Sequence, residues 1–576
     1  MRPRATLLAL MSVAALVLAT APSALAHAQL TGSDPARGAV APEQPERVTL
    51  RFSEPVEATF GDVRVFDASG ARVDDGDVEH PGGAGETLSV GLRPGLPDGG
   101  YTATYRVISA DSHPVSGGFV FSIGARGPPP AQRVDELIDG GGADGAVQTA
   151  AGVVRWVAYA AIAVGLGALA FLALVWRPAL AAVGGAGEAW ASAARRFERR
   201  ARMLVLAAAA AGIVSGVVGI VLQGAIAAGV PLGDALTPHV VGEVLDTRFG
   251  TVWGTRTLAW VALGALVLAA PGLPRRILAA AAVPAAVIAV TPALGGHAGA
   301  TSPAALLVPL DVAHVVAMAV WGGGLAMFLL AVPAATRRLD PPDRSRVLAA
   351  ALLRFSPLAL ASVAALLVTG VAQSLVYLDA FGDLTGTAFG RAILAKAALL
   401  AALIGLGAVN RQRVVPRLRA IAAEGAPPGA AGRVLRGTLR GEVALVAAVL
   451  AVTAALVHFS PPGEAASGPF STDVAIGDAR LELTVDPALV GTNEIHLYLF
   501  RAADGAQYTA TRELRVAASL PERDLGPIDV EPRRAGPGHW VAPRAVLGVA
   551  GTWRVEITNR VSDFDEHAAT VEVPVG

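Results

Sequence analysis

Residues 304–321 read Ala-Ala-Leu-Leu-Val-Pro-Leu-Asp-Val-Ala-His-Val-Val-Ala-Met-Ala-Val-Trp, and Gly-Gly-Gly-Leu-Ala-Met-Phe-Leu-Leu-Ala-Val continues the run to residue 332. Only Asp311 and His314 are ionisable in this stretch. An apolar helix of this length can cross the roughly 30 Å hydrocarbon core of a bilayer. The run therefore predicts a transmembrane helix that holds polar side chains inside the membrane.

Seven further runs are long and apolar enough to cross a bilayer. Of the 576 residues, 53% are hydrophobic and only 16% are charged, which excludes a wholly soluble or disordered chain. We therefore expect a membrane domain over 149–460. Its eight spans are predicted near 152–175, 203–223, 257–273, 277–294, 304–332, 355–377, 391–409 and 441–459.

The fifth span carries Asp311, His314, Met318 and Trp321 at i, i+3, i+7 and i+10, which is one stripe of a helix. From a start near Leu306, His314 lies roughly 12 Å into the outer half of the bilayer. Histidine and methionine are both copper ligands, and the soft methionine favours Cu(I). The stripe predicts an ion pathway. The alternative is that Asp311 and His314 only hydrogen-bond neighbouring helices.

His297, in Gly295-Gly-His-Ala-Gly, precedes the fifth span and is a candidate to pass an ion downward. We therefore predict a membrane copper pathway of His297, Asp311, His314 and Met318. A solvated loop histidine is the alternative for His297, as it is for His239 and His458. Lys396, early in the seventh span, is expected to pair with a buried carboxylate, for which Asp311 is one candidate.

The charge and cysteine counts exclude several classes of protein. Lys+Arg 46 against Asp+Glu 47 leaves a formal net charge of -1, so the basic excess of a nucleic-acid binder is missing. With Cys 0, disulfides and thiolate metal sites are excluded, and a metal must be held by His, Met, Asp, Glu or backbone groups. The sequence holds no phosphate-binding loop motif, so we expect no ATP hydrolysis.

Residues 1–26 have the pattern of a secretory signal peptide. Basic Arg2 and Arg4 precede an apolar run, and Ser23-Ala-Leu-Ala26 places small side chains at the cleavage site. Cleavage after Ala26 would make His27 the first residue, so its α-amine and imidazole could bind one metal ion together. Alternatively, His27 is merely the residue that follows the signal.

Arginine placement predicts the orientation in the membrane. A cleaved signal puts the first domain outside, and eight spans return the C-terminus outside, in the cytoplasmic membrane of a bacterium. The predicted inner loops carry the arginines Arg177, Arg195, Arg196, Arg199, Arg200, Arg202, Arg275, Arg276, Arg337, Arg338, Arg344, Arg346, Arg411, Arg413, Arg417, Arg419, Arg433 and Arg436.

Two extracytoplasmic β domains flank the membrane domain. Residues 27–124 and 470–576 alternate apolar and polar side chains between Gly, Pro and Asp turns, which predicts a small sandwich or barrel and a second sandwich. The Pro- and Gly-rich residues 125–148 read as a linker. Strands are expected at 47–52, 63–66, 88–92, 101–107, 118–123, 479–485, 494–500 and 552–558.

Asp111 and His113 form the strongest candidate metal pair in the first domain. They are two residues apart, so on an extended segment they project to the same side. Together with the amine and imidazole of His27 they would supply nitrogen and oxygen donors in a set that suits Cu(II). The alternative is that Asp111 and His113 only cap a turn. His80 is expected to be an exposed loop residue.

The first domain resembles the CopC copper-binding proteins. The resemblance rests on His27-Ala-Gln-Leu, Phe52-Ser-Glu-Pro-Val, Gly100-Tyr101 and Arg106-Val-Ile-Ser-Ala-Asp-Ser-His-Pro-Val-Ser-Gly117, followed by Phe119-Val-Phe-Ser-Ile. It implies a Cu(II) site in which His27 supplies a histidine brace completed by Asp111 and His113. This domain has no methionine, so the methionine-rich Cu(I) site of some members is not expected.

The membrane domain resembles the CopD family of copper-resistance or copper-uptake proteins. The resemblance rests on Gly295-Gly-His-Ala, Asp311 to Leu325, Arg354-Phe-Ser-Pro and Gly386-Thr-Ala-Phe-Gly-Arg-Ala-Ile-Leu-Ala-Lys396. The whole chain is thus similar to a CopC–CopD fusion. Through Gly491-Thr-Asn the last domain weakly resembles the YtkA-like sandwiches, and its His496, His539 and His567 are predicted to lie on the surface.

Copper import is the leading functional hypothesis, with Cu(II) captured outside and copper, as Cu(I) if reduced, passed through the membrane domain. Other copper-handling proteins or a reductase are the partners to expect besides copper and the lipid bilayer. The alternative is copper sequestration or sensing for resistance without transport. An oxygen-activating copper enzyme ranks last, because Asp111 fills a position that such enzymes keep open or occupy with Tyr or Phe.

Overall fold

The computed structural model describes residues 28, 30–37, 39–109, 114–124, 145–270, 272–301, 303–378, 381–457, 459, 470–503 and 506–575. The predicted signal peptide and most of the predicted linker lie outside these residues. The helical part forms one compact unit, and the two β domains together form another.

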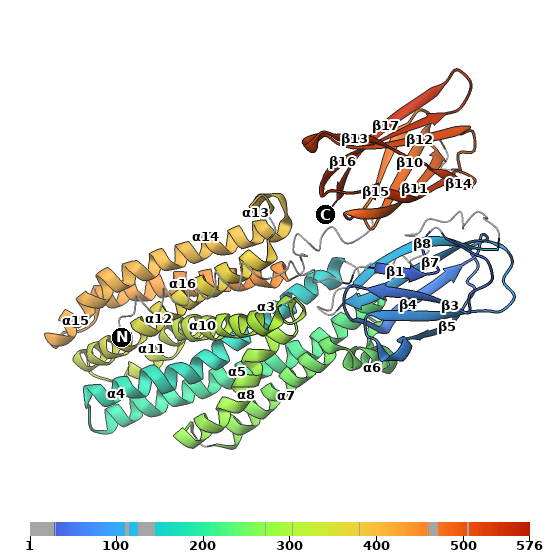
Figure 1. The fold of residues 1–576 in the computed structure, drawn as a ribbon. Helices are drawn as coiled ribbons and strands as arrows, with labels where there is room; N and C mark the ends of the chain where they lie inside the picture. Colours follow the sequence, from blue (N-terminus) through green and yellow to red (C-terminus); the bar gives the residue numbers. More distant parts are fainter. Residues whose placement is uncertain are drawn as a thin grey trace. The chain divides into compact units, whose positions relative to one another are not determined.

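Eight helices are long and apolar enough to cross a membrane, which confirms the predicted number of spans within the described residues (Figure 1). The first helix begins at Gly145, so the last four residues of the predicted linker belong to it. The helical unit comprises α3 (Gly145–Phe171), the π-helical turn η2 (Leu172–Trp176), α4 (Arg177–Val183), α5 (Glu188–Ala228), η3 (Asp234–Leu236), α6 (Pro238–Asp246), α7 (Arg248–Ala269), α8 (Arg275–Leu294), α9 (His297–Ala300), α10 (Ala304–Leu330), α11 (Val332–Thr336), α12 (Pro341–Tyr377), α13 (Asp383–Gly386), α14 (Ala388–Val409), the π-helical turn η4 (Asn410–Val414), α15 (Val415–Ala423) and α16 (Gly429–Leu456).

Most of the arginines predicted in inner loops lie on helices that extend beyond the apolar spans. Arg195 to Arg202 belong to α5, and Arg344 and Arg346 belong to α12. Arginine and alanine are strong helix formers, so these segments stay helical where the hydrophobic pattern ends. The charged ends of long helices therefore replace the loops that hydropathy alone predicts.

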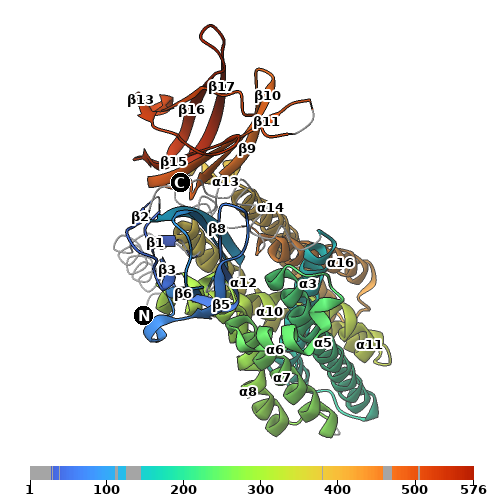
Figure 2. The same ribbon diagram turned by 90° about the vertical axis from the view of Figure 1, so that its right-hand side faces the viewer.

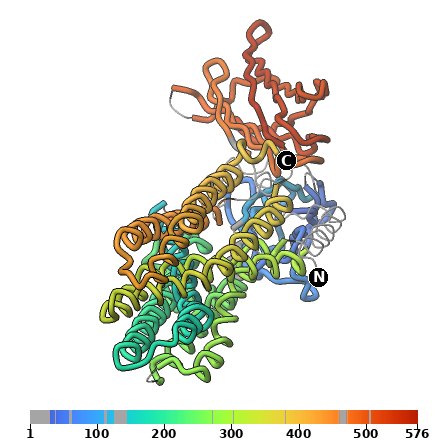
Figure 3. Tube along the Cα trace, turned by 90° about the vertical axis from the view of Figure 1, so that its left-hand side faces the viewer, coloured from blue at the N-terminus to red at the C-terminus, as the bar shows by residue number. Residues whose placement is uncertain are grey.

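The long helices run side by side as a bundle (Figure 3). Within it, helix α10 packs against α3, α8, α12 and α16. Its contact with α3 depends on two glycines, because a Cβ at Gly323 would collide with the Ala163 carbonyl oxygen and one at Gly167 with the Ala319 carbonyl oxygen. Small residues let helix backbones approach closely, which is the usual way helices associate in lipid. The Gly-Gly-Gly segment after Trp321 thus serves packing.

The N-terminal domain is a sandwich of two four-stranded sheets, with strand orders β1-β3-β6-β5 and β2-β8-β7-β4. Its strands are β1 (Leu30–Asp34), β2 (Val40–Ala41), β3 (Arg47–Phe52), β4 (Val56–Phe66), β5 (Asp74–Glu79), β6 (Thr87–Leu92), β7 (Gly99–Ser109) and β8 (Pro114–Ile123), with a 3₁₀ turn η1 (Pro81–Gly83). All five strands predicted here are confirmed. Between the sheets lie alternating apolar residues such as Val48, Leu50, Val90 and Phe119.

The C-terminal domain is a second sandwich, with strand orders β14-β15-β11-β10-β9 and β13-β12-β16-β17 (Figure 2). Its strands are β9 (Phe470–Ile476), β10 (Ala479–Asp486), β11 (Gly491–Arg501), β12 (Glu513–Leu520), β13 (Leu525–Val530), β14 (Arg533–Gly536), β15 (His539–Leu547), β16 (Gly551–Arg560) and β17 (Glu566–Val575), with a 3₁₀ turn η5 (Pro521–Arg523). Trp553 lies in its core and is 1% exposed.

The close approach of α3 and α10 is testable by enlarging one glycine. Gly323→Val should lower the free energy of unfolding by about 1–3 kcal/mol, because the new side chain meets backbone atoms that cannot move aside. Thermal unfolding of the purified protein in detergent measures the effect. Gly405→Val is the matched control, since nothing lies within 4 Å of a Cβ there. Equal stability of the two variants would contradict the packing described for α10.

Candidate metal centre

Strand register brings two distant segments of the N-terminal domain to one end of the sandwich. At the start of β1, Leu30 pairs with Phe52, the last residue of β3. At the start of β4, Val56 pairs with Ser109, the last residue of β7. The backbone N–H groups of Phe52 and Val56 donate to the neighbouring carbonyls of Glu86 and Gly85, at 2.7 and 2.9 Å. Both pairs therefore lie at the same end.

The predicted copper ligands adjoin these strand ends. His27 precedes β1, while Asp111 and His113 lie between β7 and β8; all three are outside the described residues. Among the residues that the structure describes, no group of three or more His, Asp or Glu side chains is arranged to hold a metal ion. His80 is half-buried, and its Nδ1 lies 2.8 Å from the Thr87 carbonyl oxygen. That contact gives His80 a structural role within its turn.

In the helical unit, Asp311 and His314 on α10 both face α12. The side-chain amide of Gln373 donates a hydrogen bond to Asp311 Oδ1 at 3.1 Å. The charges of Lys396 on α14 and of His297 also act on Asp311, but among the described residues no ion pair joins Lys396 to Asp311, so that pairing stays a prediction. An ionisable side chain in an apolar bundle needs such partners on neighbouring helices.

The contact between His314 and Thr369 is compatible with a proton on Nδ1 of the His314 ring. His314 Nδ1 lies 2.8 Å from Thr369 Oγ1. The Thr369 hydroxyl also lies 2.7 Å from the Ala365 carbonyl oxygen, and if it donates there, its oxygen accepts from Nδ1–H. The other nitrogen, Nε2, then keeps its lone pair. A hydrogen bond on one nitrogen that leaves the other free is the arrangement of metal-binding histidines.

The other predicted pathway residues have different surroundings. His297 lies on the short helix α9, with its ring centroid 6.1 Å from that of Tyr377. Met318 packs beside the apolar core of the helices, and Trp321 is buried within it. Among the described residues, polar side chains of α12 contact the stripe at Asp311 and His314, near its outer part. Met318 and Trp321 continue the stripe through apolar packing. His239 is exposed beside Glu243, and His458 lies outside the described residues.

Sequence reasoning missed several polar residues inside the spans. Thr369 and Gln373 are the partners on α12, and their only sequence signal is their spacing of four residues in an apolar run. Arg256 on α7 is buried, donates to Thr291 Oγ1 at 3.0 Å and lies 4.8 Å from the Trp253 ring. Its charge directly before the third predicted span, 257–273, was the available signal.

A second polar group joins α16 to the π-helical turn η4. Glu442 is 3% exposed, and its Oε1 accepts a hydrogen bond from the Asn410 amide at 3.0 Å. Thr438 donates to the other side of that amide, to Asn410 Oδ1, at 2.7 Å. Glu442, Asn410 and Thr438 therefore each have a hydrogen-bond partner, as buried polar side chains require.

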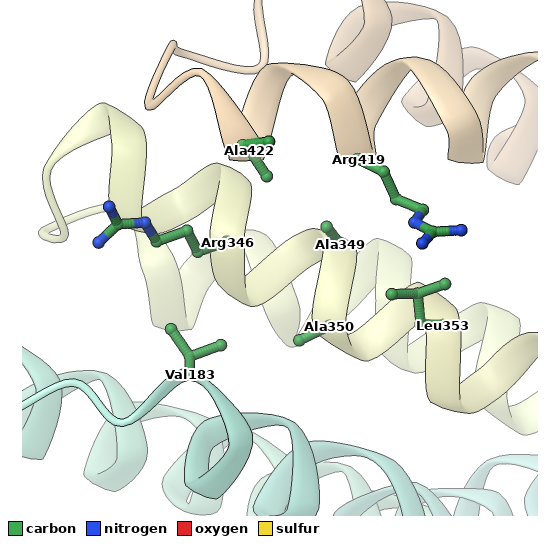
Figure 4. Close-up of a pocket in the computed structure, with 8 residues that line it drawn as sticks. Val183, Arg346, Ala349, Ala350, Leu353, Arg419 and Ala422 are labelled. Atoms are coloured by element: carbon green, nitrogen blue, oxygen red, sulfur yellow. The ribbon is translucent and has the colours of Figure 1, made fainter.

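A surface pocket lies elsewhere in the helical unit, between α4, α12 and α15 (Figure 4). Its walls are mostly alanine, valine and leucine side chains, with Arg346 and Arg419 among them. None of its lining residues is a copper ligand, so this pocket contributes nothing to a metal centre.

In the C-terminal domain the prediction of three surface histidines is wrong for two of them. His496 is 0% exposed and His539 2%, and their Nδ1 and Nε2 atoms lie 3.2 Å apart. His496 lies on β11 and His539 on the adjacent strand β15, on a sheet face that the alternation pattern assigns to solvent. Only His567, which is half-buried, retains exposure.

Family models match three segments of the chain. The CopC domain matches residues 30–124, the N-terminal domain of copper resistance protein D-like proteins matches 146–307, and copper resistance protein D matches 349–456. The chain belongs to the CopC–CopD fusion copper proteins. Copper handling by a membrane protein is therefore its general role, as the resemblances predicted.

The fusion architecture has a relative of similar length. Copper transport protein CutJ of Bacillus subtilis is 26% identical over 484 residues, which cover 82% of this chain and 82% of that protein. Copper resistance protein C of Escherichia coli is 32% identical over 119 residues, covering 19% of this chain and 90% of that protein. The crystal structure of CopC from Methylosinus trichosporium OB3b covers 19% of this chain and 98% of its own, at 26% identity and a TM-score of 0.16.

Thr369→Val tests whether the tautomer of His314 matters to copper handling by this CopC–CopD fusion. The variant keeps the side-chain shape but removes the acceptor for Nδ1–H. Loss of such a supporting contact should lower copper transport about tenfold or more, measured as initial uptake at limiting copper. Ser374→Ala on the same helix is the control, because the Ser374 hydroxyl bonds only within α12, to the Gly370 carbonyl oxygen. Similar uptake by both variants would show that the contact between Thr369 and His314 does not contribute to copper transport.

Proposed function

We propose that the protein captures Cu(II) outside the cytoplasmic membrane through His27, Asp111 and His113. The observation that supports this is the strand register, which brings the start of β1 and the end of β7 to one end of the sandwich. An amine, two imidazoles and a carboxylate form a donor set that suits Cu(II). The terminal amine becomes available only if the signal peptide is removed after Ala26.

We further propose that the helical domain carries copper inward past His297, Asp311, His314 and Met318. His314 lies ten residues into α10, which places it roughly 15 Å along that helix. Its free Nε2 and the carboxylate of Asp311 offer ligands at a depth where unpaired polar groups are costly. Met318, one turn further along, would suit Cu(I) if a reductase supplies it.

Transport in this proposal needs no chemical reaction on the protein, so we assign no enzymatic activity. Copper is the cargo, and its gradient, the membrane potential or capture by another copper-handling protein drives it. Moving one elementary charge through a potential of 100 mV is worth about 2.3 kcal/mol. Both β domains would then lie outside a bacterial cytoplasmic membrane, where copper first meets the protein.

Copper accumulation in cells tests capture and import together. At limiting external copper, cells with the intact protein should hold more copper than cells with an empty vector, and His314→Ala should abolish the gain. His27→Ala should reduce the gain several-fold at limiting copper and less at high copper, because it weakens only the capture step. His239→Ala, an exposed histidine of α6, is the control and should behave as the intact protein does.

The competing function is copper sequestration or sensing without transport. It predicts that intact protein, His314→Ala and empty vector accumulate the same copper in the cytoplasm. Cell fractionation separates copper held by the outer domain from copper that has crossed the membrane. Equal cytoplasmic copper in all strains would overturn import. Copper sequestration or sensing by the outer domain would then be the better explanation.

A further inference from the structure

One face of the C-terminal sheet carries buried polar groups where solvent is expected. Along β11, Ile495, Leu497 and Leu499 point into the sandwich core, so the alternate residues Glu494 and His496 point to the opposite face. An isolated two-sheet sandwich leaves that face in water. Glu494 and His496 are nevertheless both 0% exposed.

Five residues on neighbouring strands form this group, which we call the β11 cluster: Asp486, Glu494, His496, Tyr498 and His539. Asp486 on β10 pairs with Glu494, and Tyr498 pairs with His539 on β15. The Tyr498 and His539 rings stack at 4.1 Å, and His496 Nε2 lies 3.2 Å from Glu494 Oε1. Burying so many polar groups is costly unless another surface satisfies them.

The N-terminal domain supplies that surface through strand β8. In its sheet β8 is bonded along one side to β7, while on the other side β2 reaches only Ser122 and Ile123. The Gly118 N–H donates to Asp486 Oδ2 at 3.3 Å, and the Val120 N–H donates to Glu494 Oε1 at 3.4 Å. Alternate N–H groups are those that point outward from an edge strand.

Arg37 completes the contact from the segment after β1. Its Nη1 lies 3.8 Å from Asp486 Oδ1 and 3.3 Å from the Asp486 carbonyl oxygen. Burial raises the pKa of Asp486, while Arg37 and the Gly118 N–H oppose that shift because they stabilise the carboxylate. The buried carboxylates thus meet one guanidinium and two backbone donors.

We propose that the C-terminal domain is a built-in partner of the copper-capture domain and holds it by the open edge of β8. Strand β8 follows directly on residues 110–113, which include Asp111 and His113. A domain that holds β8 in place also anchors one end of the segment that carries those two residues. The β11 cluster therefore acts as a positioning device, and the docking contact exists whether or not copper passes through the helices.

Hydrogen exchange on the full chain in lipid nanodiscs tests the docking contact. In the intact protein, peptides covering 116–121 should exchange slowly. Asp486→Ala/Glu494→Ala should speed exchange of these amides about tenfold or more, because it removes the carboxylates that accept from the Gly118 and Val120 N–H groups. Arg37→Gln, which alters the N-terminal-domain side of the contact, should also speed exchange of these amides.

Two controls separate docking from unfolding. Peptides of β16 around Trp553 report whether the C-terminal domain stays folded in each variant. Asp478→Asn alters a carboxylate of the same domain that accepts a hydrogen bond from Tyr508 and lies outside the β11 cluster, so it should leave 116–121 protected. Fast exchange of 116–121 in the intact protein, or exchange unchanged in both interface variants, would overturn the proposal.

A second readout tests the positioning role and rests on the proposed Cu(II) site. The Cu(II)-loaded interface variants should release copper to a chelator several-fold faster than the intact protein does, with the same electron paramagnetic resonance spectrum. An unchanged release rate alongside faster amide exchange would overturn positioning but retain docking. Absence of Cu(II) binding in the intact protein would instead count against the proposed capture site.

Discussion

A polar side chain inside an apolar helical bundle must find a partner on a neighbouring helix, and α10 has two such side chains to satisfy. Asp311 is held by Gln373 and His314 by Thr369, both from α12. The glycines on the opposite side of α10 allow α3 to approach closely. Together these contacts fix the rotation of α10, and with it the direction in which His314 presents Nε2.

The eight spans and the longer strands were predictable because each is encoded by a local period. Strands β3, β7 and β11 alternate clearly, and the predicted segments fall within them. The short strand β2 and the turn-rich β5 carry too few alternating residues to show a period. The long helices were predicted too short, because the apolar residues end at the membrane surface while the arginine-rich segments continue as helix.

The candidate sites were predictable residue by residue, but their partners were not. His314 stands out in the sequence because a histidine is rare at that depth, whereas Thr369 is an ordinary residue whose role depends on which helix packs beside it. His496 and His539 were assigned to the surface because alternation says which face a residue occupies and nothing about what covers that face. Their neighbours Asp486 and Glu494 accept hydrogen bonds from strand β8, across more than 350 residues of chain.

Copper flux through the purified protein tests the central claim most directly. Liposomes containing the protein and a trapped copper-sensitive fluorophore would receive external copper, once as Cu(II) and once with a reductant to supply Cu(I). The account predicts faster fluorescence change than in protein-free liposomes in at least one of these states, and a return to the protein-free rate with His314→Ala. Binding of copper by the intact protein with no flux in either state would contradict it.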